Sequence, residues 1–348
     1  MTANPAAQTT VPVDLAVVGL HFGRKMLDEL RAADGLIRVA GVCDLDQDLA
    51  AGTAARFATH QYPDLPAVLA DPNIQAVALF TGPVGRAGLI RQAIRAGKHV
   101  MTTKPFELDP AAAHDVLTEA RRRGLVVWLN SPSPRLPADL AQIQQWCGEL
   151  DLGRPVGAQA AIWASYQETA DGSWLDDPER CPVAPICRLG IYLINDLIRL
   201  FGPARQVQVM QRRLRTGRPT PDNAHLTVGF DGGVIAGVYS SFCVDDGRPY
   251  RDRATLTYER GTVTRTRDES GTVTLELARG GHPVLRQTVI DAENGAYHCD
   301  EFVKAVHGGH PGAGPRHVED IVAGVSVLAA MGRAAGSGRI EDVPAVGV

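Results

Sequence analysis

The first 130 residues alternate short apolar segments with amphipathic segments, and this alternation constrains the fold more than any other feature. Short apolar runs are typical of buried strands, and a 3.6-residue apolar period is typical of helices. Their regular alternation predicts a doubly wound parallel sheet with helices on both faces. We expect strands over residues 14–18, 37–43, 75–80, 98–102 and 125–129, separated by helices over residues 23–33, 47–57, 84–96 and 110–123.

The pattern changes at Ser131-Pro132-Ser133-Pro134, which disfavours both helix and strand, so a domain boundary is expected there. Residues 272–277 then alternate polar and apolar side chains, as half-buried strands do. The sequence predicts a disordered tail over residues 1–11, an α/β domain over residues 12–131 and an α+β domain with an antiparallel sheet over residues 132–348. Helices are expected over residues 137–150, 188–201, 295–307 and 318–335, and the last two can pack back on the first domain.

Composition excludes several classes of function. The net charge of −4 gives no basic footprint for nucleic acid. No apolar run approaches the roughly 18 residues of a membrane helix, and the first ten residues do not resemble a signal peptide. Six scattered cysteines without a Cys-x-x-Cys pair favour reduced thiols in a cytoplasmic protein, although Cys181 and Cys187 could meet. The spacing of His307, His310 and His317 matches no zinc pattern, so no metal site is expected.

A glycine turn joins the first expected strand to the first expected helix. In Gly19-Leu20-His21-Phe22-Gly23, such a turn lets backbone N–H groups and a helix N-terminus face a pyrophosphate. His21 stands where the usual second glycine permits close approach. A tight strand-to-helix turn without a ligand would also use glycine, so this motif alone leaves both interpretations open.

Asp44 strengthens the nucleotide interpretation. It ends the second expected strand 25 residues after Gly19, near the spacing of a carboxylate that accepts from ribose hydroxyls. A carboxylate repels a 2′-phosphate, and no Arg or Lys follows within three positions, so NAD is favoured over NADP. Leu45 would contact the cofactor beside Asp44. The alternative is that Asp44 only caps the following helix. Residues 12–131 are thus predicted to be an NAD(P)-binding Rossmann domain.

Two segments carry a family resemblance. The sequence Ala96-Gly97-Lys98-His99-Val100, followed by Lys104-Pro105, resembles the Gfo/Idh/MocA family of glucose–fructose oxidoreductase and inositol dehydrogenase. The resemblance implies a large open, mainly antiparallel sheet in the second domain and a site between the domains. It also implies cofactor contacts from Lys104, from the loop Thr81-Gly82-Pro83 and from Arg86, which stands near a common His.

The family's second motif falls on residues 188–195. Gly190-Ile191-Tyr192 resembles the variant found in glucose–fructose oxidoreductase and dihydrodiol dehydrogenases, which implies proton transfer by Tyr192. Arg188 and Asn195 depart from the usual acids of this motif, and Thr103 replaces the glutamate before Lys104. These departures leave open whether catalysis is kept, redirected or lost.

The residues themselves also suggest chemistry. Lys104 follows a parallel strand at the sheet edge where α/β proteins bind ligands. Partial burial and a nearby cationic nicotinamide would lower its pKa toward roughly 7–8, where proton transfer is efficient. At 100° per residue, Arg188, Tyr192, Asn195 and Arg199 form one polar stripe of a helix. That stripe faces either water or the nicotinamide, and a lysine in a loop can equally be an ordinary surface residue.

Two roles are open for Arg188. Its guanidinium could lower the pKa of Tyr192 one helical turn away, or it could bind a carboxylate or phosphate of the substrate. Asn195 is a second candidate substrate contact on this helix. Trp174 could form an apolar wall against a sugar ring, or it could simply pack.

Three functions remain open at this point. The first is an NAD(H)-dependent oxidoreductase for a secondary alcohol or ketone of a sugar, cyclitol or related polyol. The second is a non-catalytic NAD-binding regulator, and the third is a hydrolase or epimerase that keeps NAD tightly bound. By analogy with the family, a homodimer or homotetramer through the second domain's sheet is expected.

Overall fold

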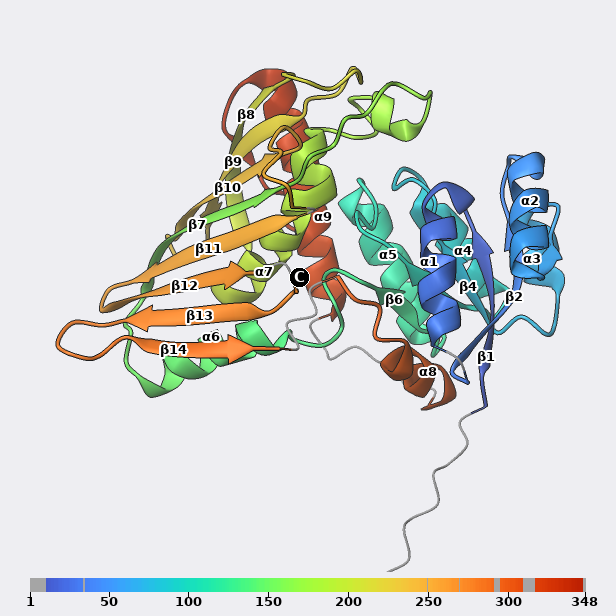
Figure 1. Ribbon diagram of the computed structural model, residues 1–348, viewed down its shortest axis with the longest axis horizontal. Helices are drawn as coiled ribbons and strands as arrows, with labels where there is room; N and C mark the ends of the chain where they lie inside the picture. The colour runs from blue at the N-terminus through green and yellow to red at the C-terminus, as the bar shows by residue number, and fades with distance from the viewer. Residues whose placement is uncertain are drawn as a thin grey trace, which may run out of the picture.

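The computed structural model describes residues 11–33, 35–248, 250–268, 270–290, 295–308 and 317–346. Ten of the eleven residues of the predicted tail lie outside these ranges, and so does His310. The described residues form two sheets, which stand side by side with helices between them (Figure 1).

The first sheet has six parallel strands in the order β3-β2-β1-β4-β5-β6. The predicted doubly wound sheet is therefore correct. Two short elements between residues 60 and 70 were not foreseen. The strands are β1 (Val13–Val18), β2 (Ile37–Cys43), β3 (His60–Gln61), β4 (Ala76–Leu79), β5 (His99–Thr102) and β6 (Val127–Leu129). The helices are α1 (Leu20–Ala32), α2 (Gln47–Phe57), α3 (Leu65–Ala70), α4 (Arg86–Arg95) and α5 (Pro110–Arg122).

Aspartates begin three of these helices. Asp46 accepts the backbone N–H of Leu49 at 3.0 Å, and Asp64 and Asp109 cap α3 and α5 in the same way. An N-cap carboxylate satisfies backbone donors that have no partner within the helix. Asp46 is thus the N-cap of α2.

The second sheet has nine strands in the order β14-β13-β12-β11-β7-β10-β9-β8-β15. Only β7 and β10 pair in parallel, so the predicted mainly antiparallel sheet is also correct. Its strands are β7 (Pro155–Trp163), β8 (Ala204–Arg212), β9 (Asn223–Phe230), β10 (Ile235–Ser241), β11 (Arg251–Tyr258), β12 (Gly261–Arg267), β13 (Val273–Ala278), β14 (Leu285–Val289) and β15 (Glu341–Asp342).

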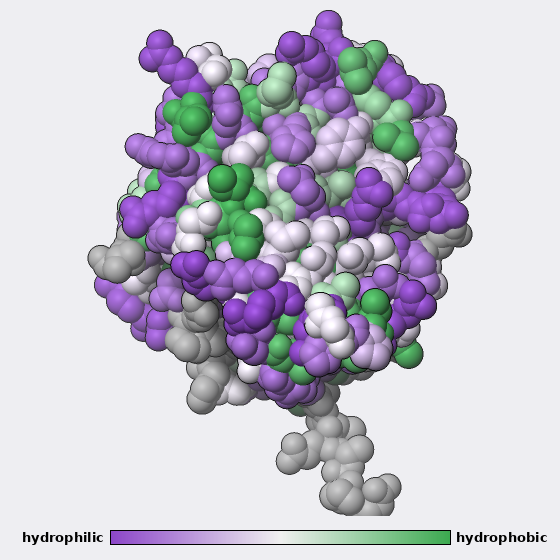
Figure 2. Space-filling view, turned by 90° about the vertical axis from the view of Figure 1, so that its left-hand side faces the viewer, coloured by the Kyte–Doolittle hydropathy of each residue, from purple (hydrophilic) through white to green (hydrophobic). Residues whose placement is uncertain are grey.

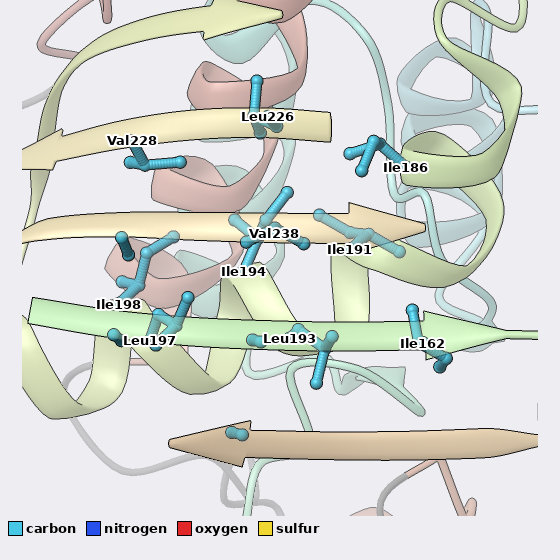
Figure 3. Packing of buried hydrophobic residues seen from close by; sticks show 14 of the residues in the cluster. Ile162, Ile186, Ile191, Leu193, Ile194, Leu197, Ile198, Leu226, Val228 and Val238 are labelled. Atoms are coloured by element: carbon cyan, nitrogen blue, oxygen red, sulfur yellow. The ribbon is translucent and has the colours of Figure 1, made fainter. Parts of the chain in front are cut away.

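One face of the second sheet is covered by helices α6 (Ala138–Glu149), α7 (Ile191–Phe201) and α9 (His317–Ser337) (Figure 1). The helix α7 lies against the middle strands. Its Leu193 and Ile194 meet Val238 of β10 and Ile162 of β7 in one buried cluster (Figure 3). Because this core packs α7 against the sheet, the residues that precede α7 are held near the ends of β7 and β10.

Both closing helices pack on the first sheet, and α9 also reaches the second. Phe302 of α8 (Cys299–Gly308) packs edge-on against Trp128 of β6, with ring centroids 6.0 Å apart. Ile321 and Val325 of α9 belong to the core of the first sheet, whereas Leu328 and Met331 of the same helix belong to the core of the second. A single helix therefore contributes to both cores. No helix among the described residues is long and apolar enough to cross a membrane.

Candidate active site

The glycine turn is held by main-chain contacts. Gly19 has φ +89°, donates its N–H to Cys43 O at 3.0 Å, and would place a Cβ 2.9 Å from the Phe80 carbonyl carbon. Only glycine fits such a position. The helix α1 begins at Leu20, three residues earlier than predicted, so His21 and Phe22 lie exposed in its first turn. The N–H groups of that turn consequently lie directly after the glycine bend.

Asp44 lies across from this turn, at the end of β2. One carboxylate oxygen accepts Leu20 N–H at 2.6 Å, and the other accepts Asp46 N–H at 2.9 Å. The cap of α2 is Asp46, so the alternative in which Asp44 only caps that helix is not what the structure has. The neighbouring Leu45 is fully exposed.

The loop Thr81-Gly82-Pro83 meets a residue of the second domain. A Cβ on Gly82 would lie 3.1 Å from Cδ1 of Trp174, so the indole ring rests on the glycine backbone. Trp174 lies in the short 3-10 helix Trp174–Asp176, on the loop after β7. The predicted aromatic wall therefore packs on the loop proposed to contact cofactor.

An ion-pair cluster fixes the loop that carries Trp174. Arg218 binds Glu168 at 3.0 Å, Asp171 at 2.9 Å and Asp176 at 2.7 Å, and only 7% of its side chain is exposed. The same Glu168 also accepts hydrogen bonds from both terminal nitrogens of Arg188. These ion pairs join the loop to the segment between β8 and β9 and to the turn before α7.

Arg86 has a different task from the predicted cofactor contact. Its side chain is 1% exposed, and its guanidinium donates to the carbonyls of Thr81, Thr103, Pro105 and Phe106. Burial lowers the pKa of Arg86 to about 10, which leaves it charged at neutral pH. Because its two terminal nitrogens donate to these carbonyls, Arg86 holds the loop at Thr81 against the segment that follows β5.

Lys104 follows β5 and reaches the second domain. Its Nζ donates to the backbone carbonyl of Arg188 and lies 4.7 Å from the centroid of the Tyr192 ring. Burial, helped by the Arg188 charge, lowers the pKa of Lys104 to about 8. The amine is thus held where it can exchange a proton near neutral pH. The Lys104 amine and the Tyr192 phenol ring, which come from different domains, therefore lie side by side.

The prediction that Arg188 lowers the pKa of Tyr192 is wrong. Residues Ile186–Gly190 form a π-helical turn, which is wider than an α-helical turn and rotates Arg188 off the polar stripe. Its guanidinium binds Glu168 at 2.7 and 2.8 Å and stacks on Tyr166 and Phe242. Burial raises the pKa of Tyr192, and the phenol keeps its proton. The Arg188 guanidinium, which could have bound a substrate anion, is also already paired with Glu168.

Asn195 does not face the cleft either. It is 3% exposed, donates to Ser131 Oγ at 3.0 Å, and presses its amide oxygen on Gly324 of α9, where a Cβ would lie 2.4 Å away. Behind Lys104, Asn195 and Ser131 line a cavity of about 10 Å³, roughly the space of one water. The predicted substrate contact is instead a packing contact between helices.

Sequence reasoning missed Asn130. This residue follows β6 and is 3% exposed, yet it contacts Thr103, Lys104 and Tyr192. Its place at the carboxyl end of a parallel strand, next to the strand that carries Lys104, was the available signal. Among the described residues no group of His, Cys, Asp and Glu could hold a metal ion, and the six cysteines are free thiols.

A Rossmann domain joined to an open, mainly antiparallel sheet defines a class of two-domain dinucleotide-binding proteins. Residues 13–131 match the oxidoreductase family with an NAD-binding Rossmann fold, Gfo/Idh/MocA, and residues 140–264 match a C-terminal domain of the same family. The chain belongs to the Gfo/Idh/MocA family, as its motifs indicated.

Individual relatives share modest sequence identity with this chain. The dTDP-3,4-didehydro-2,6-dideoxy-alpha-D-glucose 3-reductase of Actinomadura kijaniata is 30% identical over 207 residues, which cover 56% of this chain and 59% of that one. GenD2 from gentamicin A biosynthesis, solved with NAD, has a TM-score of 0.77 at 22% identity over 99% and 100% of the chains. KijD10, a 3-ketoreductase from Actinomadura kijaniata solved with NADP and TDP-benzene, has a TM-score of 0.74 at 21% identity over 92% and 96%. At these identities the solved structures establish the fold alone.

Proposed function

We propose that the protein is an NAD(H)-dependent oxidoreductase that interconverts a secondary alcohol and a ketone of a sugar, cyclitol or related polyol. One observation carries the proposal: Lys104 and Tyr192, from different domains, meet at the carboxyl edge of the parallel sheet whose strand β1 ends in the glycine turn. In this scheme residues 12–131 bind the cofactor, and residues 132–348 bind the substrate.

The residues at the glycine turn fit a dinucleotide. The backbone at Gly19, where a Cβ has no room, and the N–H groups of His21 and Phe22 in the first turn of α1 would receive a pyrophosphate. The Asp44 carboxylate would accept from a ribose, and exposed Leu45 would cover the adenine side. When bound, the cofactor supplies or accepts the hydride. We favour NAD because the Asp44 charge opposes a 2′-phosphate, although relatives of this fold were solved with either cofactor.

The chain's own residues would move the proton. A group with a pKa of about 8 can accept a proton from an alcohol and return it to a ketone, which suits the Lys104 amine. The phenol of Tyr192, whose pKa burial raises, would stay protonated and donate a hydrogen bond to the reacting oxygen. A lowered amine pKa at this place favours chemistry over nucleotide binding alone.

The substrate class rests on relatives. The Actinomadura kijaniata reductase is named for a nucleotide-linked keto sugar, so sugars with a ketone or secondary hydroxyl are the first compounds to assay. The test is NADH formation or consumption with a panel of sugars, cyclitols and their nucleotide-linked forms. Net turnover that requires Lys104 supports the proposal. Binding of NADH with no turnover across the panel would favour a regulator, and product without net cofactor change would favour a hydrolase or epimerase.

We also propose self-association through the outer face of the nine-stranded sheet. In the described part of the chain no helix covers this face, and Figure 2 shows a weakly polar centre with a strongly polar rim on the side where the sheet lies. Ile235 and Met210 are 64% and 71% exposed there. A stable interface buries about 800 Å² per partner, which a nine-stranded face can supply. Light scattering would test this, and a monomer at micromolar concentration would contradict it.

A further inference from the structure

We propose that Asn130 is a positioning residue for the reaction: it holds the Tyr192 phenol and the Lys104 backbone in one arrangement and sets the direction of the Tyr192 proton. The inference rests on the proposed function, which assigns Lys104 and Tyr192 to proton transfer. It adds a residue that touches neither substrate nor cofactor but contacts both proton-bearing groups.

The contacts of Asn130 come from three separate segments of the chain. Its Oδ1 accepts the backbone N–H of Lys104 at 3.2 Å and the Thr103 hydroxyl at 3.4 Å. Its Nδ2 donates to the Tyr192 hydroxyl at 3.3 Å and to the Gly295 carbonyl at 3.2 Å. All four hydrogen-bonding positions of the amide are therefore used. Such a saturated side chain, with 3% exposure, has a single orientation.

The orientation of the amide follows from the chemistry of the backbone. The N–H of Lys104 can only donate, so the atom that faces it must be the oxygen of Asn130. The carbonyl of Gly295 can only accept, so the atom that faces it must be the nitrogen. Tyr192 is on the nitrogen side as well. The phenol oxygen is consequently an acceptor from Asn130, and the roles cannot be exchanged by flipping the amide.

The direction of the hydrogen bond from Asn130 decides where the Tyr192 hydroxyl proton points. A hydroxyl that accepts from Asn130 cannot also donate to the same nitrogen, so its own proton points elsewhere, and the Lys104 amine over its ring does not accept it while that amine is protonated, as it is for ketone reduction. The proton is left for a substrate oxygen in the cleft. The same hydrogen bond lowers the pKa of Tyr192 against the effect of burial, which makes transient sharing of the proton easier.

The side chain also couples two elements that the fold brings from opposite domains. Gly295 lies against the Tyr192 ring, where an added Cβ would sit 3.2 Å from Cε1, so the ring is confined between Gly295 and Lys104. The Asn130 amide crosses this gap from β5 to α7. A displacement of either Lys104 or Tyr192 would break at least one of its hydrogen bonds, so the two groups keep one relative position.

The test uses the full-length protein with ¹³Cζ-labelled tyrosine and the variants Asn130→Ala and Asn130→Asp. The aspartate keeps the acceptor for Lys104 N–H and removes the donor to the phenol, which guards against a folding defect of the alanine variant. The Tyr192 signal, assigned with Tyr192→Phe, should shift in both variants. We expect kcat to fall about tenfold or more with KM within about threefold, because the contact acts on the proton rather than on binding.

A double-mutant cycle separates positioning from simple destabilisation. If the donor of Asn130 acts through the phenol, Asn130→Asp should cost little further kcat in the Tyr192→Phe background. The matched control is Asn223→Ala, since Asn223 accepts a hydrogen bond from Tyr239 at 2.9 Å within the nine-stranded sheet rather than from Lys104 or Tyr192. It should move the Tyr239 signal and leave turnover unchanged.

Two results would overturn the inference: an unmoved Tyr192 signal in both variants, or equal losses of kcat with and without the phenol hydroxyl. A wild-type protein that binds NADH but turns over no sugar would instead overturn the proposed function. In that case the Tyr192 signal still decides whether Asn130 holds the phenol.

Discussion

The proposed site has a nucleotide end, at the glycine turn and Asp44, and a substrate end, at Lys104, Asn130 and Tyr192. The two ends are built in different ways. The nucleotide end is made of main chain and of neighbours in sequence: Leu20 N–H meets Asp44 across 24 residues of one β-α-β unit. At the substrate end, the Lys104 amine meets Arg188 O across 84 residues, and Asn130 meets Gly295 O across 165. A turn can be specified by a local motif, whereas a cleft of side chains needs the tertiary fold. The two ends should therefore fail differently when mutated.

They also differ in their electrostatics. The residues at the nucleotide end are exposed to water, including His21, Phe22 and Leu45. At the substrate end burial lowers the pKa of Lys104 and raises that of Tyr192. Steric fit and charge should therefore control cofactor affinity at the nucleotide end, and protonation should control turnover at the substrate end.

The largest expected effect separates the ends most cleanly. Replacing Lys104 with methionine removes the amine and keeps a chain of similar length, so kcat should fall about a hundred- to ten-thousand-fold. The NADH affinity should change little, because the turn at Gly19 is untouched. Steady-state kinetics and NADH fluorescence titration measure the two quantities. Lys304→Met, on an exposed helix face, is the matched control. Retained turnover in Lys104→Met would remove the amine from the mechanism.

The second prediction perturbs the nucleotide end by the replacement Gly19→Ala. The new Cβ meets the Phe80 carbonyl at 2.9 Å in a backbone with φ +89°, which costs about 1–2 kcal/mol of folding stability before any clash. Because the bend must shift, NADH affinity should fall roughly ten- to a hundred-fold. Gly124→Ala has a similar positive φ of 68° but open space around the added Cβ. It should lose stability and keep its affinity, and equal affinities in both variants would contradict the pyrophosphate assignment.

Much of the nucleotide end could be predicted from the sequence. Strand and helix periodicity located β1, β2 and α2, and the spacing from Gly19 to Asp44 identified the crossover between them. These features depend on neighbours within one β-α-β unit. The start of α1 was misplaced because the glycine turn was read as three residues longer than it is.

The substrate end was predicted less well, for a physical reason. The assumed 100° per residue put Arg188 beside Tyr192, but the π turn Ile186–Gly190 adds a residue to the helical turn and aims Arg188 at Glu168. Nothing in the local sequence announces such a turn, because it is stabilised by partners on other elements. Asn130 and the burial of Arg86 were missed likewise, since both depend on which loops meet.

A smaller effect is expected at Asp44. Asp44→Ala removes a charge that opposes the 2′-phosphate of NADP. Two unit charges near 4 Å in water interact by about 1 kcal/mol, so the ratio of NAD to NADP affinity should fall roughly fivefold to tenfold. Affinities for both cofactors, titrated at low salt, provide the measurement. The same replacement at Asp48, an exposed residue of α2, is the control. An unchanged ratio would show that Asp44 does not face the ribose.

The smallest effect tests the electrostatics of the substrate end. With a Lys104 pKa of about 8, kcat/KM for alcohol oxidation should rise with pH up to that value and then level, because the neutral amine is the base. For ketone reduction the sign reverses: the ammonium is the acid, so kcat/KM should stay level and fall above about pH 8.

Arg188→Leu sharpens this test. The Lys104 amine donates to the Arg188 main-chain carbonyl, which any side chain retains, so the replacement keeps this hydrogen bond while it removes the ion pair with Glu168 and the positive charge that helps lower the Lys104 pKa. Both pH profiles should move upward by less than about one pH unit, a few-fold change in oxidation rate at neutral pH. Arg188→Lys keeps the charge and should move them less. A large rise in KM with unmoved profiles would mean that Arg188 leaves Glu168 to bind substrate, and the substrate end would then be less rigid than its ion pairs indicate.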